Sequence, residues 1–194
     1  MLIKKLDNYN IILGSSSIRR KELLEKMDLN FVIKTSTKKE NYSKNIRLDQ
    51  VASFLAEEKS KNIKKSLSGK YLLITADTIV ISDNKILHKP INKKEAFHFL
   101  KNLSDNSHDV ITGVSIVSNN FKKNFSVKTE VTFNKLNDEE INYYINKYCP
   151  FDKAGSYGIQ EWIGHIGVKK INGCYNNVIG LPTSKLLQEL KVFV

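Results

Sequence analysis

Apolar and polar positions follow one another in blocks that predict strands alternating with helices. Short apolar runs bounded by turn residues are typical of strands and occur at residues 11–13, 31–35, 71–82 and 110–117, with an alternating run at 125–133. Apolar residues at helical spacing follow Ser17, span residues 48–65, and follow Asn92, Asn137 and Pro182. This order predicts an α/β fold with a mixed central sheet and flanking helices.

Capping residues and turns mark several boundaries of these elements. Asn92 with Glu95, and Asn137 with Glu140, have the spacing of capping boxes that open helices. The residues 83–84, Asp-Asn, predict a tight turn after the long apolar strand. The segment 162–171 completes the pattern before a turn at 172–173 and the closing helix.

We expect a single domain over residues 1–194, although length and composition also allow two lobes that share a cleft. At 194 residues and 41% hydrophobic content the chain can bury a substantial core. No apolar run approaches the roughly 20 residues of a membrane span, and the first ten residues lack the core of a signal peptide. Cys149 and Cys174 are outside any CxxC spacing. We therefore expect a soluble cytoplasmic protein with no membrane partner, disulfide framework or zinc site.

The formal net charge of +11 leaves two interpretations open. It could serve nucleic-acid binding, or it could reflect a general preference for Lys. Of the 31 Lys and Arg residues only three are Arg, and the Lys residues are spread along the chain rather than gathered with aromatic residues. We expect no specific nucleic-acid partner, although the charge would still attract small anionic substrates.

Two of the three Arg residues lie together in a loop of small residues. Arg19 and Arg20 close the run 14–20, Gly-Ser-Ser-Ser-Ile-Arg-Arg, between a predicted strand and a predicted helix. A helix start after a strand is a frequent anion site, and the planar guanidinium matches phosphate geometry. The alternative is an ordinary N-cap at Ser17 followed by a basic first turn. Cations are disfavoured at a helix N-terminus unless an anion is shared there, so the loop favours a phosphate ligand.

An acidic residue interrupts the longest apolar strand. Asp77 lies within residues 74–80, Ile-Thr-Ala-Asp-Thr-Ile-Val, where its carboxylate needs a partner, a metal ion or a chemical role. A hydrogen bond to neighbouring backbone is the alternative. Thr78 adds a polar contact, and Lys89 after the predicted hairpin adds a cation that could reach the same side.

Two further polar segments have less specific patterns. Residues 152–160, Asp-Lys-Ala-Gly-Ser-Tyr-Gly-Ile-Gln, combine glycines that allow close backbone approach with the donors of Lys153 and Gln160. A surface hairpin is the alternative interpretation. Glu40 and Lys59, taken in isolation, are interpreted as solvated surface charges.

Taken together, these segments resemble the Maf family of nucleoside triphosphate pyrophosphatases. The resemblance extends from Ile12 to Leu190. It is carried, in order, by SSSIRRKELLEKM, ADTIV, KP, the strand at 113–114, DKAGSYGIQ and NNVIGLP. It implies a mixed α/β fold with two lobes around a cleft, as in Maf and ITPase-like proteins. It also implies hydrolysis of a nucleoside triphosphate to the monophosphate and pyrophosphate with a divalent cation.

The resemblance also implies a role for each residue that matches a family motif. Asp77 would be the catalytic base and a metal ligand, and Glu40 would assist in binding the metal. Mg²⁺ is the expected cation, with Mn²⁺ and Co²⁺ as alternatives. The residues implied to bind the substrate or select it are Ser15, Arg19, Arg20, Lys59, Thr78, Lys89 and Gln160.

Within the family, three positions favour the branch that acts on dTTP and UTP: Arg19, Thr78 and Gln160. The branch acting on 7-methyl-GTP has a different residue after the Asp and lacks the AGxYGIQ run. Two alternatives stay open, namely a pyrophosphatase for 7-methyl-GTP or another modified or purine triphosphate, and a non-enzymatic nucleic-acid-binding regulator of division. A homodimer is also possible.

Overall fold

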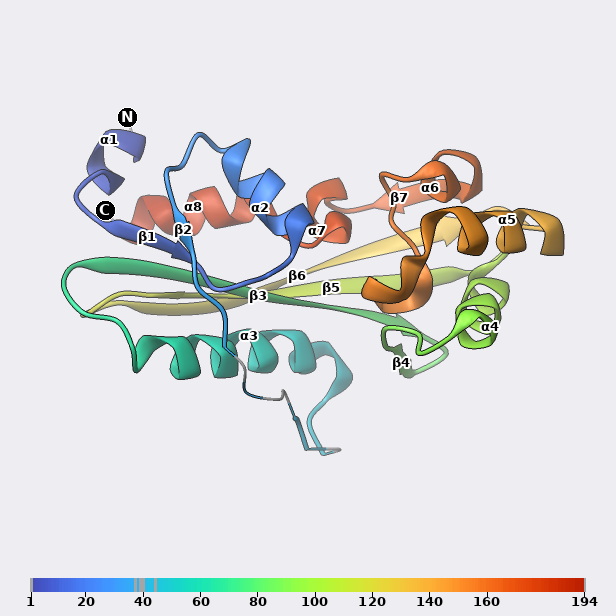
Figure 1. Ribbon diagram of the computed structural model, residues 1–194, viewed down its shortest axis with the longest axis horizontal. Helices are drawn as coiled ribbons and strands as arrows, with labels where there is room; N and C mark the ends of the chain where they lie inside the picture. The colour runs from blue at the N-terminus through green and yellow to red at the C-terminus, as the bar shows by residue number, and fades with distance from the viewer. Residues whose placement is uncertain (1, 37, 39–40, 44, 194) are drawn as a thin grey trace. The chain divides into compact units, whose positions relative to one another are not determined.

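The computed structural model describes residues 2–36, 38, 41–43 and 45–193, which form alternating strands and helices (Figure 1). The strands are β1 (Asn10–Leu13), β2 (Val32–Ile33), β3 (Tyr71–Ser82), β4 (Lys85–Leu87), β5 (Ser107–Val117), β6 (Lys122–Phe133) and β7 (Val168–Asn172). The α-helices are α1 (Leu2–Leu6), α2 (Ile18–Glu25), α3 (Leu48–Lys64), α4 (Lys93–Leu103), α5 (Asp138–Tyr148), α6 (Trp162–Gly167), α7 (Tyr175–Ile179) and α8 (Thr183–Phe193). Two short 3₁₀ helices, η1 (Pro150–Asp152) and η2 (Ala154–Ser156), follow α5.

The strands form one mixed seven-stranded sheet, so the predicted α/β class is confirmed. Its order is β2-β1-β3-β5-β6-β7, and β4 pairs with β3 outside this path. The β1 strand runs parallel to both β2 and β3, with Leu13 opposite Ile33 and Ile74. The β3–β4 and β6–β7 pairs are antiparallel. The parallel β1–β3 pair matters for function because ligands of such sheets bind at the carboxyl ends of the strands.

The chain divides into two compact units. The first comprises residues 1–77, 112–127 and 180–194, and the second comprises residues 78–111 and 128–179. The strands β3, β5 and β6 run from one unit into the other. The single domain over residues 1–194 stays a prediction.

In the first unit, α3 lies on one side of the strands, and α2 and α8 lie on the other (Figure 1). Close packing of α3 depends on Gly113 in β5, because a Cβ there would lie 2.2 Å from the backbone nitrogen of Ser53. Ile63 of α3 is 3% exposed and packs with Ile12 and Leu73 of the sheet. Burial of these side chains stabilises the helix position by about 1.5–3 kcal/mol each.

In the second unit, helices and strands enclose an aromatic and aliphatic core. Its members include Leu100 of α4, Tyr144 of α5, Phe133 of β6 and Ile163 of α6, all 1% exposed or less. His108 of β5 stacks on Phe133 with ring centroids 5.5 Å apart. Tyr157, in the segment after α5, packs edge-on against both of these rings.

Several boundaries predicted from capping residues are confirmed. Asn137 caps α5 in a full capping box with Glu140, whose carboxylate accepts from the Asn137 backbone N–H. Asn92 caps α4 by accepting from the Glu95 backbone N–H at 2.9 Å. The Glu95 carboxylate reaches one residue further back and accepts from Ile91, so that box is incomplete.

One predicted strand is wrong in extent, and the structure decides two segments that the sequence left open. The strand predicted at 31–35 is only the two residues of β2. The segment 162–171 begins as helix α6 and becomes strand β7 only at Val168. Residues 152–160 form no surface hairpin, because η1, η2 and a turn occupy this segment and Gly155–Ile159 are buried. Short buried apolar runs do not distinguish strand from helix, so the sequence pattern assigns no element type to 162–171.

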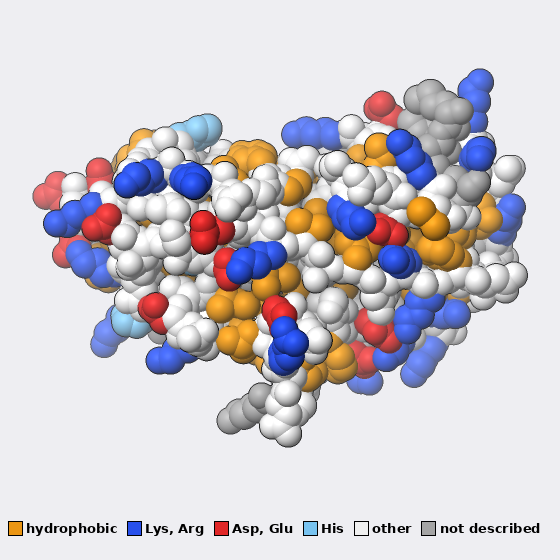
Figure 2. Space-filling view, turned by 180° about the vertical axis from the view of Figure 1, so that it is seen from behind, with side chains coloured by type: hydrophobic (Ala, Val, Ile, Leu, Met, Phe, Trp, Pro, Cys, Tyr) orange, Lys and Arg blue, Asp and Glu red, His pale blue; other side chains and the backbone are white. Residues whose placement is uncertain are grey.

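Figure 2 shows blue Lys and Arg side chains scattered over the visible face, with red Asp and Glu side chains among them. The positive charges on this face therefore form no continuous stripe. None of the helices built from the described residues has the length and apolar character needed to span a membrane.

Candidate functional site

The carboxylate of Asp77 pairs with the ammonium of Lys59. Lys59 Nζ lies 2.5 Å from Asp77 Oδ1, and it also donates to the backbone carbonyl of Ala76 at 3.3 Å. Each of the two charged side chains is 15% exposed. The partner of Asp77 is thus a cation on α3 rather than neighbouring backbone, and the interpretation of Lys59 as a solvated surface charge is wrong.

The position of this pair follows from the parallel strands. Gly14 extends the β1–β3 pairing, since its N–H donates to the carbonyl of Ile74 at 2.7 Å. The chain then leaves the sheet at Ser15. There it lies beside the part of β3 that ends the first unit, whose last residue is Asp77. The small-residue loop and Asp77 therefore lie at the same end of the sheet.

In the first turn of α2, directly after this loop, the Arg20 guanidinium donates to two acceptors. Its Nε donates to the Gly180 carbonyl at 2.9 Å, and its Nη1 donates to Ser15 Oγ at 3.2 Å. Ser17 is the N-cap of α2, as predicted, and its Oγ accepts from the Arg20 backbone N–H. The first turn of α2 contains Arg19 and Arg20 and no acidic residue. A helix N-terminus with two guanidinium groups is suited to a phosphate chain.

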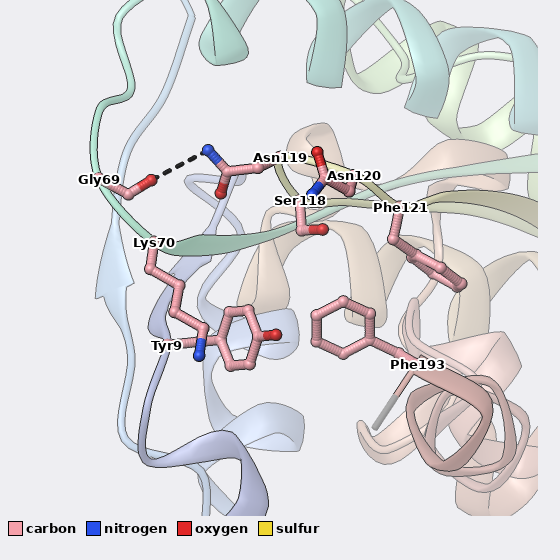
Figure 3. Close-up of a pocket in the computed structure, with 8 residues that line it drawn as sticks. All are labelled: Tyr9, Gly69, Lys70, Ser118, Asn119, Asn120, Phe121 and Phe193. Atoms are coloured by element: carbon pink, nitrogen blue, oxygen red, sulfur yellow. Dashed lines mark hydrogen bonds between the residues drawn. The ribbon is translucent and has the colours of Figure 1, made fainter.

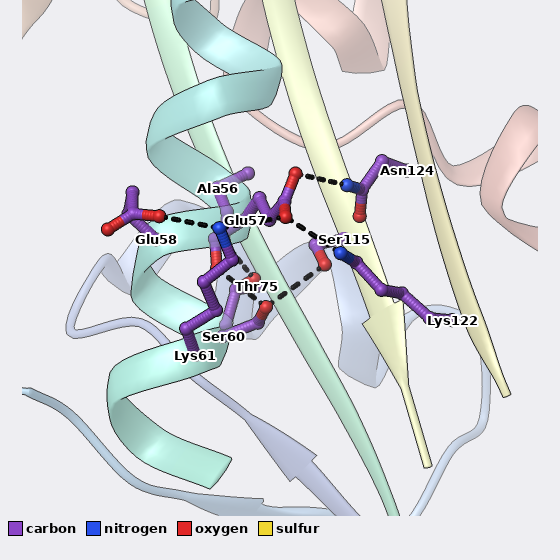
Figure 4. Close-up of polar contacts among 9 residues, drawn as sticks. All are labelled: Ala56, Glu57, Glu58, Ser60, Lys61, Thr75, Ser115, Lys122 and Asn124. Carbon is purple, nitrogen blue, oxygen red and sulfur yellow. Dashed lines mark hydrogen bonds and ion pairs between the residues drawn. The ribbon is translucent and has the colours of Figure 1, made fainter. Parts of the chain in front are cut away.

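The helix that presents Lys59 is fixed to the sheet by the polar contacts drawn in Figure 4. Thr75 Oγ1 of β3 donates to the Ala56 carbonyl at 2.6 Å. Glu57 accepts from Lys122 Nζ and from Asn124 Nδ2 of β6, each at 2.7 Å. The hydrogen bond from Lys122 is the main reason that the pKa of Glu57 lies below its usual value. These bonds anchor the turn of α3 that precedes Lys59.

The remaining predicted residues belong to the second unit. Thr78 follows Asp77 in β3 and is half-buried. Lys89 is exposed, although Pro90 after it is buried. Gln160 is half-buried at the turn after η2, and among the described residues its Oε1 is buried without a hydrogen-bond partner.

Sequence reasoning missed the contacts of the segment before Gln160. Lys153 was considered a donor for a ligand, but its side chain is 9% exposed and its Nζ lies 3.0 Å from Glu161 Oε1. Tyr144 of α5 donates to the other oxygen of the same carboxylate. The alternation of small and polar residues in this segment gives no sign of a buried ion pair. The signal that could have indicated this ion pair is Glu161, an acidic residue directly after the segment 152–160.

The residues present are compatible with a bound divalent cation. Among the described residues, no group of three or more His, Cys, Asp and Glu could enclose a metal ion. Glu40, the predicted second ligand, lies outside the described residues. Mg²⁺ is commonly held by one or two carboxylates together with waters and substrate phosphates, so the single carboxylate of Asp77 fits this type of site.

A separate hollow of about 710 Å³ lies at the other end of the first unit's strands (Figure 3). Lys70 and Tyr9 immediately precede β3 and β1, and the Lys70 ammonium lies 4.4 Å from the centroid of the Tyr9 ring. Phe193 packs against the same ring at 4.9 Å. The hollow is lined by Tyr9, Gly69, Lys70, Ser118, Asn119, Asn120, Phe121 and Phe193. None of the predicted site residues is among them, so the candidate chemistry lies elsewhere.

Matches to a protein family and to known proteins extend along nearly the whole chain. A family model described as Maf-like protein matches residues 10–193. A dTTP/UTP pyrophosphatase of Parabacteroides distasonis is 47% identical over 193 residues, which cover 99% of this chain and 100% of that protein. The protein of the same name from Bacteroides fragilis strain YCH46 is 44% identical over 191 residues, covering 98% of this chain and 99% of that protein.

A more distant relative of the same name comes from Flavobacterium johnsoniae, with 43% identity over 194 residues and full coverage of both chains. Among solved structures, a nucleoside-triphosphatase / dITP/XTP pyrophosphatase from Mycobacterium abscessus matches with a TM-score of 0.41 and 11% identity. That match covers 95% of this chain and 97% of the other.

Proposed function

The chain belongs to the Maf-like protein family, and from this premise we propose that it hydrolyses dTTP and UTP to the nucleoside monophosphate and pyrophosphate. Full-length relatives named dTTP/UTP pyrophosphatase, at 43–47% identity, support this substrate class. The observation that carries the proposal is the partly buried Asp77 carboxylate. It lies beside Lys59, at the end of the sheet where the small-residue loop that leads to Arg20 begins.

Asp77 is the group that we assign to the attacking water. Its Oδ1 accepts from Lys59, whereas its Oδ2 makes no hydrogen bond to any described residue. An oxygen of this kind can accept a proton from water as the water attacks the α-phosphorus, and the proton then resides on the Asp77 carboxyl. The α–β anhydride bond breaks, and pyrophosphate leaves.

The cationic groups of the first unit are assigned to the phosphates. Arg20 has its guanidinium plane oriented by Gly180 and Ser15, which reduces the entropy lost when it binds an oxyanion. Lys59 supplies a second positive charge next to the base. Arg19 and Lys89 are assigned to the same phosphate chain on the basis of the family motifs.

A divalent cation, Mg²⁺ or alternatively Mn²⁺ or Co²⁺, would be held by Asp77, with Glu40 assisting. When bound, such a cation neutralises charge on the phosphate oxygens. The Asp77 carboxylate provides the hard oxygen ligand that these ions prefer.

Gln160 is assigned to binding of the pyrimidine ring. Thr78 is assigned to a substrate contact that distinguishes the dTTP/UTP branch of the family from the 7-methyl-GTP branch. A carboxamide presents one donor and one acceptor, which complement the imide edge of uracil and thymine, and cytosine reverses part of that pattern. The buried Gln160 Oε1 without an internal partner supports this role, because a substrate N–H would satisfy it.

The reaction can be tested by the position of bond cleavage. UTP is hydrolysed in ¹⁸O-labelled water with Mg²⁺, and the products are separated and weighed by mass spectrometry. We expect UMP that carries the label and unlabelled pyrophosphate, because attack occurs at the α-phosphorus. Release of orthophosphate, or label in the pyrophosphate, would contradict the proposed reaction.

A further inference from the structure

A buried polar cluster contacts the chain just before and just after Gln160. It consists of Tyr144, Lys153 and Glu161, with the backbone N–H of Gly158, and we call it the Tyr144 cluster. Tyr144 Oη accepts from the Gly158 N–H at 3.0 Å and donates to Glu161 Oε2. Lys153 Nζ lies 3.0 Å from Glu161 Oε1. Both oxygens of the Glu161 carboxylate therefore have a partner, and the Tyr144 hydroxyl acts both as a donor and as an acceptor.

The cluster is largely shielded from water. Tyr144 is fully buried, and the side chains of Lys153 and Glu161 are 9% and 19% exposed. Burial, reinforced by the hydrogen bond to Glu161, raises the pKa of the Tyr144 phenol, so that its proton stays in place to be donated. Hydrogen bonds between charged and neutral groups in such surroundings are strong and directional.

These contacts hold the chain on both sides of Gln160. Gly158 and Glu161 are closed into a turn, since the Glu161 N–H donates to the Gly158 carbonyl at 3.0 Å, with Ile159 and Gln160 between them. The Tyr144 oxygen contacts both ends of this turn. A Cβ at Gly158 would lie 2.7 Å from Glu161 Cδ, so a side chain there would displace the Glu161 carboxylate from the cluster. The backbone turn that carries Gln160 is thus tied to α5.

We propose that Tyr144 and Glu161 are positioning residues for base selection, which fix the turn from which Gln160 reads the pyrimidine. The inference rests on the proposed function of Gln160. It predicts that loosening the cluster leaves hydrolysis intact and weakens the discrimination between UTP and CTP.

The test uses Tyr144→Phe and Glu161→Gln, with Tyr143→Phe as the matched control. Tyr143 lies on the same helix, and its hydroxyl pairs with the exposed Lys147 outside the cluster. For each variant, kcat and KM are measured for UTP and CTP, together with the melting temperature. Loss of a hydrogen bond to a charged group should raise KM for UTP and lower the UTP-over-CTP preference by about tenfold or more. The value of kcat should change by less than about threefold.

A double-mutant cycle separates positioning from simple destabilisation. In a Gln160→Ala background, Tyr144→Phe should have no further effect on substrate preference, because the group that it positions is gone. A preference that stays at the wild-type value in folded Tyr144→Phe and Glu161→Gln proteins would overturn the inference. So would equal effects of Tyr144→Phe with and without Gln160. A wild-type protein that hydrolyses no pyrimidine triphosphate would instead refute the proposed function, and the inference with it.

Discussion

Lys59 and Asp77 join α3 to β3 by an ion pair in which Nζ and Oδ1 are 2.5 Å apart, although 18 residues separate them in the chain. Each side chain is 15% exposed, so the pair is screened less than a surface salt bridge and still reaches water. This combination suits a base that must be held in place and must also contact a reacting water.

Replacement of Asp77 by Asn should separate catalysis from stability. The amide oxygen of Asp77→Asn can still accept from Lys59, so we expect a melting temperature close to that of the wild type. Pyrophosphate release should fall at least about 100-fold, because an amide cannot take the proton of water. Near wild-type turnover in a folded Asp77→Asn protein would remove Asp77 from the role of base.

The Arg20 guanidinium should not be replaceable by an ammonium. Arg20→Lys cannot donate to Gly180 and Ser15 and also present a planar fork, so KM for UTP should rise about tenfold or more. Arg47→Lys is the control, since Arg47 is exposed and its guanidinium pairs with the exposed carboxylate of Asp49. Steady-state kinetics would contradict the assignment if both variants behaved alike.

Gly14 and Thr75 should be coupled in stability. A Cβ at Gly14 would lie 2.4 Å from Thr75 Cγ2 and 2.8 Å from Ile63 Cδ1, so Gly14→Ala should cost about 1–3 kcal/mol by overpacking. Thr75→Ser removes the obstructing methyl group and retains a hydroxyl for the Ala56 carbonyl. Urea unfolding should therefore show that Thr75→Ser recovers part of the loss, and additive effects would argue against the contact.

Local patterns in the sequence were sufficient for much of the fold. The α5 boundary follows from a capping box at Asn137, and the β3–β4 hairpin follows from Asp83 and Asn84, both of which have positive φ. The same reasoning assigns no type to α6 and predicts too long a strand at β2, because type and extent there depend on tertiary packing that periodicity does not encode.

The candidate site was predictable only in part. The chemistry of Asp77 and Arg20 can be inferred from the sequence. Asp77 is an acidic residue within an apolar strand, and Arg20 is one of only three Arg residues in the sequence. Their partners are not visible, since Lys59 and Gly180 are 18 and 160 residues away and are brought in by folding. The Tyr144 cluster was missed for the same reason, because the carboxylate shared by Lys153 and the phenol of Tyr144 is reached from another helix only after folding.

His108 should make stability depend on pH between about 6.5 and 4. Desolvation lowers the pKa of His108 to about 4, with Asp109 opposing the shift, and its Nε2 lies 2.7 Å from Tyr157 Oη. As the pH falls from 6.5, the unfolded chain takes up a proton that the folded protein does not, so stability is lost down to about pH 4. One such group contributes a slope of at most about 1.4 kcal/mol per pH unit.

The slope is measured by urea unfolding between pH 6 and 5, above the range in which the carboxylates of Glu57 and Glu189 are protonated. Both have pKa values lowered by hydrogen bonds from lysines, so they contribute at more acidic pH. The variant His108→Gln should show a smaller slope than the wild type. Equal slopes would mean that His108 is not held neutral by burial.

The most direct test is pyrophosphate release from dTTP, UTP, CTP, GTP and 7-methyl-GTP, each with Mg²⁺ and the same amount of protein. We expect rapid release from dTTP and UTP and at least about tenfold slower release from the others, since cytosine lacks the ring N–H that would donate to Gln160 Oε1 and the relatives' name, dTTP/UTP pyrophosphatase, favours the two imide pyrimidines over purines. Preferential release from 7-methyl-GTP or GTP, or no release from any of the five by the folded protein, would contradict the proposed function.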